Sequence, residues 1–237
     1  IVKRISNRSI SANRKRNIFI VLTIVLASAL LSAIVLYGFG VMQETQNRNQ
    51  KTAQIMYHAI SEQQGQELYK QEEIAWVGEF FNAFSEQVNH STVNFTYANA
   101  DMLKSQSMLY SGDLPASENE IVVQESFLDS LGYSNELGQT IQIPFSDGTT
   151  HDFKLTGILD VKTGDIGRYT AIISKELVRQ QYGDGGMIDY YIGLKGAQNM
   201  SEEEATNYAN TLAQQLKISD DNVIVRSTYF NLSLIHI

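Results

Sequence analysis

Residues 18–42 place the strongest constraint on this sequence, because they form an apolar run without a charged residue or a proline. The small polar residues Thr23, Ser28 and Ser32 interrupt the run, and their hydroxyls can bond back to carbonyls of the same helix. As an α-helix the run is roughly 37 Å long, whereas the hydrocarbon core of a bilayer is about 30 Å thick. The run therefore predicts a transmembrane helix over residues 18–42.

Charge is distributed unevenly on the two sides of this run. No acidic residue precedes Glu44, whereas six basic residues do, and three of these lie together at Arg14, Lys15 and Arg16. From Glu44 onward there are twelve basic and 26 acidic residues, a net charge of −14. Lys and Arg collect on the cytoplasmic side of a span. Arg14, Lys15 and Arg16 thus act as a topology signal and predict a protein of the cell membrane with a cytoplasmic N-terminus and an extracytoplasmic main domain.

Two other interpretations of the apolar run fit less well. The apolar region of a signal peptide is about 7–15 residues long and ends at a small-x-small cleavage site. This run is longer, and residues 37–40 lack such a site. A buried helix of a soluble protein is disfavoured because the run is apolar on every side. A retained anchor is the favoured interpretation.

The composition excludes several kinds of chemistry. The chain of 237 residues contains no cysteine, so thiol catalysis and disulfides are excluded. The four histidines are scattered, which argues against a metal site; they are His58, His90, His151 and His236. No phosphate-binding loop or Gly-x-Ser-x-Gly motif is present. The acidic main portion argues against nucleic acid as a partner. We therefore expect no catalytic residue, no cofactor and no metal.

We divide the chain into five parts. These are a basic cytoplasmic leader (1–17), the transmembrane helix (18–42), a polar stalk or linker (43–52), an extracytoplasmic α+β domain (53–230) and a truncated tail (231–237). The roughly 190 residues after the span can form one large core or two small ones.

Hydrophobic periodicity predicts a mixture of helices and strands after the span. Predicted strands cover parts of 53–60 and residues 77–84, 92–97, 120–123, 140–145, 151–161, 169–173, 188–194 and 222–226. Predicted helices cover 66–76, 126–131, 175–182 and 201–216. Ser201 and Glu204 form a capping box, and Asp147-Gly148 predicts a hairpin turn. The fold class is therefore α+β.

Three further features of the sequence resemble functional sites, but we assign no function to them. Neighbouring acidic residues, such as Glu72 and Glu73, diverge on a helix and make poor catalytic pairs. Trp76, Phe80 and Phe81 belong, with Phe84, to an aromatic cluster that we interpret as core. The glycine-rich residues 183–186 lack the lysine of a phosphate cradle and are interpreted as a loop.

A set of turn and strand motifs runs through the main domain. The first comprises Gly112, Leu114, Pro115, Asn119, Glu120, Ile121 and Val122. It is followed by Leu131-Gly132, by residues 137–141 with Gly138, and by Phe153-x-Leu-x-Gly157-Ile158. Together with the basic leader that runs directly into a long span, this pattern resembles FtsX-like, MacB-type ABC transporter permeases.

The resemblance implies an extracytoplasmic domain of the MacB periplasmic-core type. It also implies a non-catalytic permease subunit that couples ATP hydrolysis by a separate ABC ATPase to motion of the outer domain, for export or mechanotransmission. A second permease copy or paralogue and the lipid bilayer are the other implied partners. Such permeases have typically four spans, so we expect this chain to be the N-terminal part of a longer subunit. The motifs are structural, and the transported substrate does not follow from them.

Gly38 and Gly40 lie near the outer end of the predicted span. They form a hinge or a close helix contact in one hypothesis, and they are ordinary glycines of a membrane helix in the other. Two other functions also remain open. The first alternative is a single-pass membrane sensor with an extracellular ligand-binding domain. The second is a membrane-anchored enzyme, although no recognisable nucleophile supports it.

Overall fold

The computed structural model describes residues 14–160, 168–183, 188–227 and 229–230. The chain divides into two compact units, Ile1–Arg48 and Asn49–Ile237, which are treated separately below. Most of the predicted leader and the predicted tail, together with residues 184–186 of the glycine-rich loop, lie outside the described residues.

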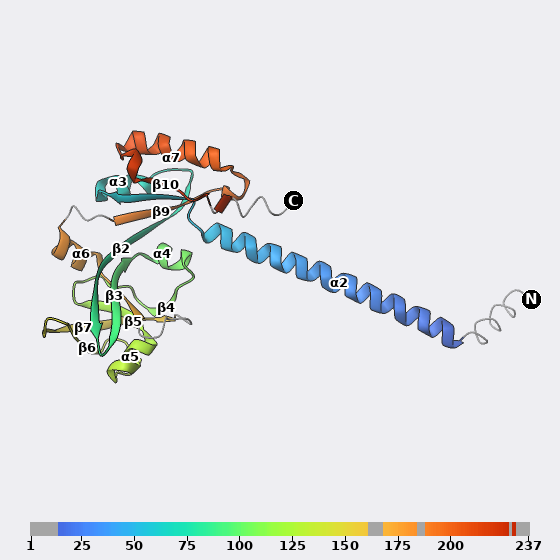
Figure 1. Ribbon diagram of the computed structural model, residues 1–237, viewed down its shortest axis with the longest axis horizontal. Helices are drawn as coiled ribbons and strands as arrows, with labels where there is room; N and C mark the ends of the chain where they lie inside the picture. The colour runs from blue at the N-terminus through green and yellow to red at the C-terminus, as the bar shows by residue number, and fades with distance from the viewer. Residues whose placement is uncertain (1–13, 161–167, 184–187, 228, 231–237) are drawn as a thin grey trace, which may run out of the picture. The chain divides into compact units, whose positions relative to one another are not determined.

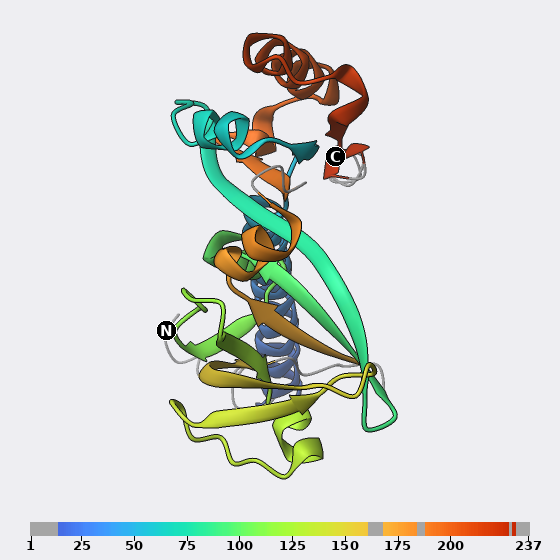
Figure 2. The same ribbon diagram turned by 90° about the vertical axis from the view of Figure 1, so that its left-hand side faces the viewer.

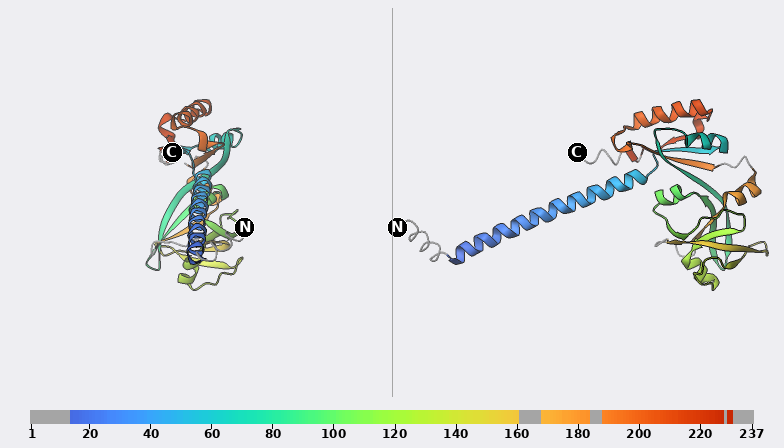
Figure 3. Two further views of the ribbon diagram at one scale, coloured as in Figure 1. Left: turned by 90° about the vertical axis from the view of Figure 1, so that its right-hand side faces the viewer. Right: turned by 180° about the vertical axis from the view of Figure 1, so that it is seen from behind.

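The first unit contains most of helix α2 (Arg14–Lys51), which is a single continuous α-helix of 38 residues (Figures 1 and 3). Its apolar side chains at positions 18–40 are exposed on every side. The Thr23 hydroxyl donates to the Phe19 carbonyl at 2.8 Å, and the Ser28 hydroxyl donates to that of Val25 at 2.9 Å, as the sequence predicts. The stretch Arg16–Gly40 is long and apolar enough to cross a membrane.

The second unit is a mixed α+β domain, which confirms the predicted fold class. Its strands are β1 (Ile55–Ile60), β2 (Ile74–Val88), β3 (Ser91–Ala98), β4 (Leu109–Gly112), β5 (Glu120–Gln124), β6 (Thr140–Pro144), β7 (Thr150–Asp160), β8 (Arg168–Ile173), β9 (Ile188–Leu194) and β10 (Val223–Val225). Its helices are α3 (Glu62–Leu68), α4 (Ala100–Ser105), α5 (Glu125–Leu131), α6 (Lys175–Tyr182) and α7 (Glu202–Leu216), with short 3-10 turns at Ala197–Asn199 and Asp220–Asn222.

The ten strands form one sheet in the order β10-β1-β9-β2-β3-β8-β5-β7-β4, with β6 paired to β7. Most neighbours are antiparallel, but β3 pairs with β8 and β5 pairs with β7 in parallel. The sheet carries two lobes. We call the part built from β1, β9, β10, α3 and α7 the α7 lobe, and the part built from β3 to β8, α5 and α6 the α5 lobe (Figure 1).

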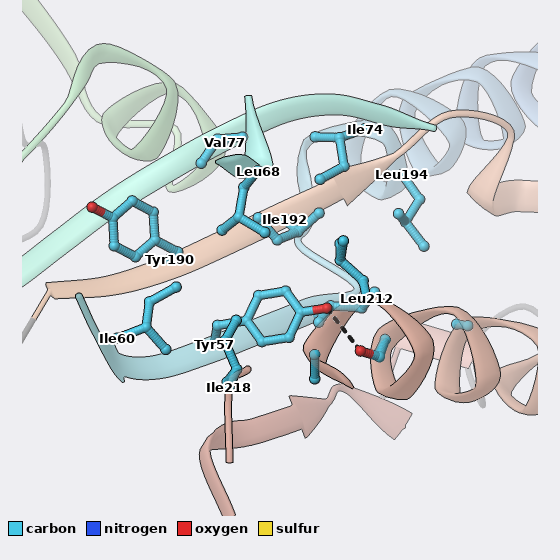
Figure 4. Close-up of a cluster of buried hydrophobic side chains, with 14 of the residues drawn as sticks. Tyr57, Ile60, Leu68, Ile74, Val77, Tyr190, Ile192, Leu194, Leu212 and Ile218 are labelled. Carbon is cyan, nitrogen blue, oxygen red and sulfur yellow. Dashed lines mark hydrogen bonds between the residues drawn. The ribbon is translucent and has the colours of Figure 1, made fainter. Parts of the chain in front are cut away.

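The core of the α7 lobe is built around two fully buried tyrosines, Tyr57 and Tyr190. Figure 4 shows them among aliphatic side chains from β1, β9 and α7, including Ile192 and Leu212. The Tyr57 hydroxyl donates to the carbonyl of Ala209 on α7 at 3.0 Å, so the buried oxygen is satisfied. Helix α7 begins at the predicted capping box, in which the Ser201 and Glu204 side chains each bond to the other's backbone N–H.

The α5 lobe has a core on each face of its part of the sheet. One face packs Phe95, Phe127 and Leu155 with other apolar residues of α5 and α6. The opposite face packs Met102 and Leu103 of α4 against the sheet. The predicted hairpin of β6 and β7 and the predicted helices 126–131 and 175–182 all lie in this lobe. Gly132 ends α5 in a left-handed conformation, with φ of +80°, as its sequence position predicts.

Strand β2 joins the two lobes (Figure 2). Its first half pairs with β9 and its second half pairs with β3. The predicted aromatic cluster on this strand is wrong as a single cluster: Phe80 packs with Tyr191, Phe81 with Tyr182, and Phe84 stacks on Phe95. The aromatic residues separate because side chains on a strand alternate between two faces and a bulge follows Asn82.

The predicted helix over residues 66–76 is also wrong. Helix α3 begins earlier, because Ser61 and Gln64 form a capping box that the apolar pattern does not reveal, and it ends at Leu68. From Ile74 the chain is already in β2. Helix α4 and strand β4 are absent from the predicted elements because both are short.

Candidate functional site: a buried charged junction between the lobes

A carboxylate is buried in the middle of β2, at the point where the strand leaves β9 and begins to pair with β3. The side chain of Glu79 is 5% exposed. Its Oε2 accepts from Lys175 Nζ at 2.9 Å and from the Tyr97 hydroxyl at 2.6 Å, and its Oε1 accepts from the Tyr69 hydroxyl at 2.8 Å. Three donors therefore compensate the desolvated charge.

The charged network continues into both lobes. Lys175 Nζ lies 3.0 Å from Glu62 Oε1, and Arg179 pairs with the same carboxylate oxygen at 2.5 Å. Glu62 lies in the first turn of α3, whereas Lys175 and Arg179 lie on α6. We call Glu62, Glu79, Lys175 and Arg179, with Tyr69 and Tyr97, the junction. The junction connects a helix of the α7 lobe to a helix of the α5 lobe.

Asn99 holds the backbone beneath the junction. Its Oδ1 accepts from the N–H of Glu79 at 3.0 Å and from that of Met102 at 2.9 Å, which caps the N-terminus of α4. Its Nδ2 donates to the Val77 carbonyl at 2.9 Å. One amide side chain therefore fixes both β2 and α4, and the position of the Glu79 backbone follows from it.

Burial and charge set the protonation of the groups around Glu79. Burial, and then the nearby Glu79 carboxylate, raises the pKa of Tyr69 and of Tyr97 well above the ordinary value of 10. Both tyrosines therefore stay protonated and remain hydrogen-bond donors. The hydrogen bond from Arg179 is the main cause that lowers the pKa of Glu62. The junction therefore joins two carboxyl side chains to two basic side chains through hydrogen bonds.

A buried ion pair is weak evidence for stability, since desolvation offsets most of the Coulomb attraction. Its partners are nevertheless specific, and breaking one side leaves an uncompensated charge that costs about 3–5 kcal/mol. We therefore expect the junction to favour one arrangement of the two lobes over others.

Sequence reasoning missed the junction. Lys175 and Glu79 are 96 residues apart, and Arg179 and Glu62 are 117 apart, so no local spacing connects them. One signal was present: Glu79 is an acidic residue inside the predicted apolar strand 77–84, where a buried charge needs a partner.

The structure brings the motif residues of the α5 lobe together along β7. Gly112 of β4 lies opposite Gly157 of β7 in the strand register. Gly112 has a φ of +83°, and a Cβ there would collide with the Thr156 carbonyl oxygen. A Cβ on Gly157 would lie 2.7 Å from the Ser111 carbonyl oxygen. This close approach of two backbones admits only glycine.

The other motif residues form the chain reversals around that pair. Glu120 accepts from the backbone N–H groups of Ala116 and Ser117 at 3.0 and 3.2 Å, which lowers the pKa of its carboxyl. The carbonyl of Asn119 accepts from the N–H of Lys154 on β7 at 2.7 Å. Gly138, with φ of +87°, donates its N–H to the Leu155 carbonyl at 2.7 Å.

Leu114 is half-buried against the core under α4, and Pro115 is half-buried beside it. The motif residues thus form a backbone corner.

The residues predicted to act as a topology signal and as a hinge lie on α2, far from that backbone corner in the sequence. Arg14 and Arg16 are exposed in the first turn of the described helix, and the backbone of Lys15 lies between them. The helix runs through Gly38 and Gly40 without a break. A Cβ at either glycine would meet no atom within 4 Å.

Among the residues that the structure describes, no group of three His, Asp or Glu side chains is arranged to hold a metal ion. His58 pairs with Asp189 at 2.7 Å on the surface of the α7 lobe, and His151 packs against Phe145.

The fold defines a class of domain, and comparison with known proteins places the chain in it. The periplasmic region of MacB from Actinobacillus actinomycetemcomitans aligns with a TM-score of 0.53 at 12% identity, over 77% of this chain and 92% of that one. The extracellular domain of the noncanonic ABC-type transporter YknZ from Gram-positive bacteria aligns with a TM-score of 0.53 at 9% identity, over 74% and 100%.

A domain of a putative permease protein from Porphyromonas gingivalis aligns with a TM-score of 0.52 at 8% identity, over 74% and 88%. At these identities the alignments show the shared fold. No curated protein matches the sequence. The family described as MacB-like periplasmic core domain matches residues 18–213, and the chain belongs to this family.

Replacing Glu79 by Gln is expected to destabilise the domain by about 3 kcal/mol, the lower end of the range for a broken buried pair, because Lys175 keeps Glu62 as a partner. The measurement is urea unfolding of the full chain in detergent, followed by the fluorescence of Trp76, the single tryptophan. Glu203→Gln, on the exposed face of α7, is the matched control and should change stability by less than about 0.5 kcal/mol. Equal unfolding midpoints for the two variants would contradict the role of the junction.

The lowered pKa of Glu62 predicts a specific dependence of stability on pH. A carboxyl whose pKa is lower in the folded protein stabilises it above the ordinary value of 4.5, and this contribution is lost as the pH falls through the lowered value. Glu62→Gln should therefore be less stable than the native chain at pH 7, and the two should converge toward pH 3. A difference in unfolding midpoint that stays constant from pH 7 to pH 3 would show that the Glu62 charge is not involved.

Proposed function

We propose that this chain is part of the permease subunit of an ABC transporter, in which a separate ABC ATPase drives motion of the outer domain through α2. Membership of the MacB-like periplasmic core domain family supports the class. The observation that carries the mechanism is the continuity of α2, which extends for eleven residues beyond Gly40, the end of the candidate span, without a break in the backbone helix.

The connection from the helix to the sheet is short and fixed within the second unit. Only residues 52–54 separate α2 from β1. Gln54 is buried, and its Oε1 accepts from the N–H of Leu194 at 2.7 Å. Its backbone N–H donates to the Ile192 carbonyl and its carbonyl accepts from the N–H of Arg226. These bonds hold Gln54 against β9 and the segment after β10, which supports transmission of a displacement from the connecting residues into the sheet.

In this proposal the junction gives the outer domain its rigidity. A displacement that arrives at β1 enters the α7 lobe, and β2 and the ion network around Glu79 pass it to the α5 lobe. The backbone corner around Gly112 and Gly157 keeps β4 paired with β7 at the edge of the sheet that β4 forms. The protein then acts as a non-catalytic transmission element for export or mechanotransmission.

Membership of the family and the distribution of charge around α2 support the proposed assembly. The N-terminus with Arg14, Lys15 and Arg16 lies in the cytoplasm, α2 crosses the cell membrane, and the α+β domain is extracytoplasmic. A second permease copy or paralogue completes the membrane part. Gly38 and Gly40 form a hinge or a close helix contact near the outer surface. Because an added Cβ meets nothing in the described part of the chain, an effect of substitution there would arise from helix stiffness or from another helix.

The transmission role predicts that breaking α2 outside the membrane uncouples the outer domain. In the native membrane complex, purified with its ATPase, Gln46→Pro should abolish the ATP-dependent change in hydrogen exchange of the outer domain, because proline kinks a helix interior at a cost of about 3 kcal/mol. ATP hydrolysis should persist. Gln46→Ala is the control and should keep the change, while Gly38→Ala with Gly40→Ala should reduce it if these residues form a hinge.

Two results would contradict the proposal. An undiminished ATP-dependent change in the Gln46→Pro complex would exclude transmission through α2. Failure of any ATPase to co-purify with the full-length native protein would remove the basis for a transporter subunit.

A further inference from the structure

On one face of the α5 lobe, apolar side chains are followed by polar side chains that carry no charge. Along β3 and β8, Phe95 and Ala171 point into the core shared with α5. The alternate residues Asn94 and Thr170, which are cross-strand partners, belong to the opposite face. On this face α4 covers the apolar part of the sheet around Ile172.

Beyond α4 the same face is hollowed. The hollow has a volume of about 250 Å³ and lies between β2, β3, β8 and the chain that leaves α4. A single water needs about 30 Å³, and sites for drug-sized ligands measure about 300–1,000 Å³. The hollow therefore suits a ligand with one ring.

Its polar side chains are largely unused by the protein itself. Asn82, Thr96, Gln106 and Thr170 line the hollow, and none of these four side chains forms a hydrogen bond within the residues that the structure describes. Thr96 is only 5% exposed. Asn94 accepts from the Ser85 hydroxyl at 2.7 Å through Oδ1, which leaves its Nδ2 available as a donor. Asn82 and Gln106 are exposed, and Asn94 and Thr170 are half-buried, so these polar groups are open to water and to a ligand.

The remaining wall is apolar, and none of the lining residues is charged. Phe80, Leu103 and Met108 supply this wall. An anion or a cation that entered would lose hydration without finding an opposite charge. Amide and hydroxyl groups beside an apolar wall instead match a neutral ligand that presents several hydroxyls, an amide and a small apolar group.

We propose that this hollow binds one neutral N-acetylated sugar ring. The acetamido group pairs with the side-chain amides of Asn82, Asn94 and Gln106, and the ring hydroxyls pair with Thr96 and Thr170. The acetyl methyl group and the apolar face of the ring pack against Phe80 and Met108. This site lies on the outer domain, and its occupancy does not require the transport cycle.

The proposal is tested by saturation-transfer NMR on the full chain in lipid nanodiscs, since maltoside detergents would present sugar to the same site. N-acetylglucosamine should give saturable binding. Glucosamine and glucuronic acid, which carry a positive and a negative charge, should bind at least tenfold more weakly. Thr170→Val combined with Gln106→Ala should weaken N-acetylglucosamine binding at least tenfold.

The control pair is Thr211→Val with Gln215→Ala, which removes the same chemical groups from the exposed face of α7 and should leave binding unchanged. If the double variant of the hollow unfolds, Asn82→Ala replaces an exposed side chain of the hollow and should weaken binding by itself. Absence of saturable N-acetylglucosamine binding, equal affinity for the charged sugars, or unchanged affinity in the folded hollow variants would overturn the proposal.

Discussion

The exclusion of apolar side chains from water is the constraint on which this protein depends most. The side chains of α2 at positions 18–40 are exposed on all sides, and each methylene group gains about 0.8 kcal/mol when it leaves water. A helix with no polar side is stable only in an apolar solvent of matching thickness. In the proposed topology that solvent is the bilayer, and three residues connect the end of the helix to β1, the first strand of the outer domain.

A second constraint operates inside the α+β domain, where one strand belongs to two lobes. Strand β2 pairs with β9 and then with β3, so the sheet is continuous while the apolar cores on either side are distinct. Glu79 lies at the change of partner and binds Lys175 from α6. Hydrophobic packing stabilises each lobe, whereas we expect the charged junction to specify how one lobe meets the other. This division of roles is compatible with a domain that moves as one body.

Local patterns in the sequence predicted much of the fold. The capping box of Ser201 and Glu204, the helix end at Gly132 and the hairpin at Asp147-Gly148 depend on residues within a few positions of each other, and the structure contains all three. The sequence motifs contained Gly112 and Gly157, but only the strand register shows that these two glycines lie opposite each other. The junction and the polar hollow could not be predicted, because their side chains come from strands and helices far apart in the chain. The predicted helix over residues 66–76 is wrong for a local reason. Tyr69 and Trp76 have the spacing of an apolar stripe on a helix, but a turn lies between them.

The central claim of this account is that α2 crosses the membrane with the α+β domain outside. The chain has no cysteine, so one cysteine at Gln215, which is exposed on α7, and another placed separately at Ser9 report the two sides independently. With a membrane-impermeant maleimide on intact protoplasts or spheroplasts, the account predicts labelling of Gln215→Cys at once and of Ser9→Cys only after permeabilisation. Labelling of Ser9→Cys in intact cells, with Gln215→Cys protected, would contradict it.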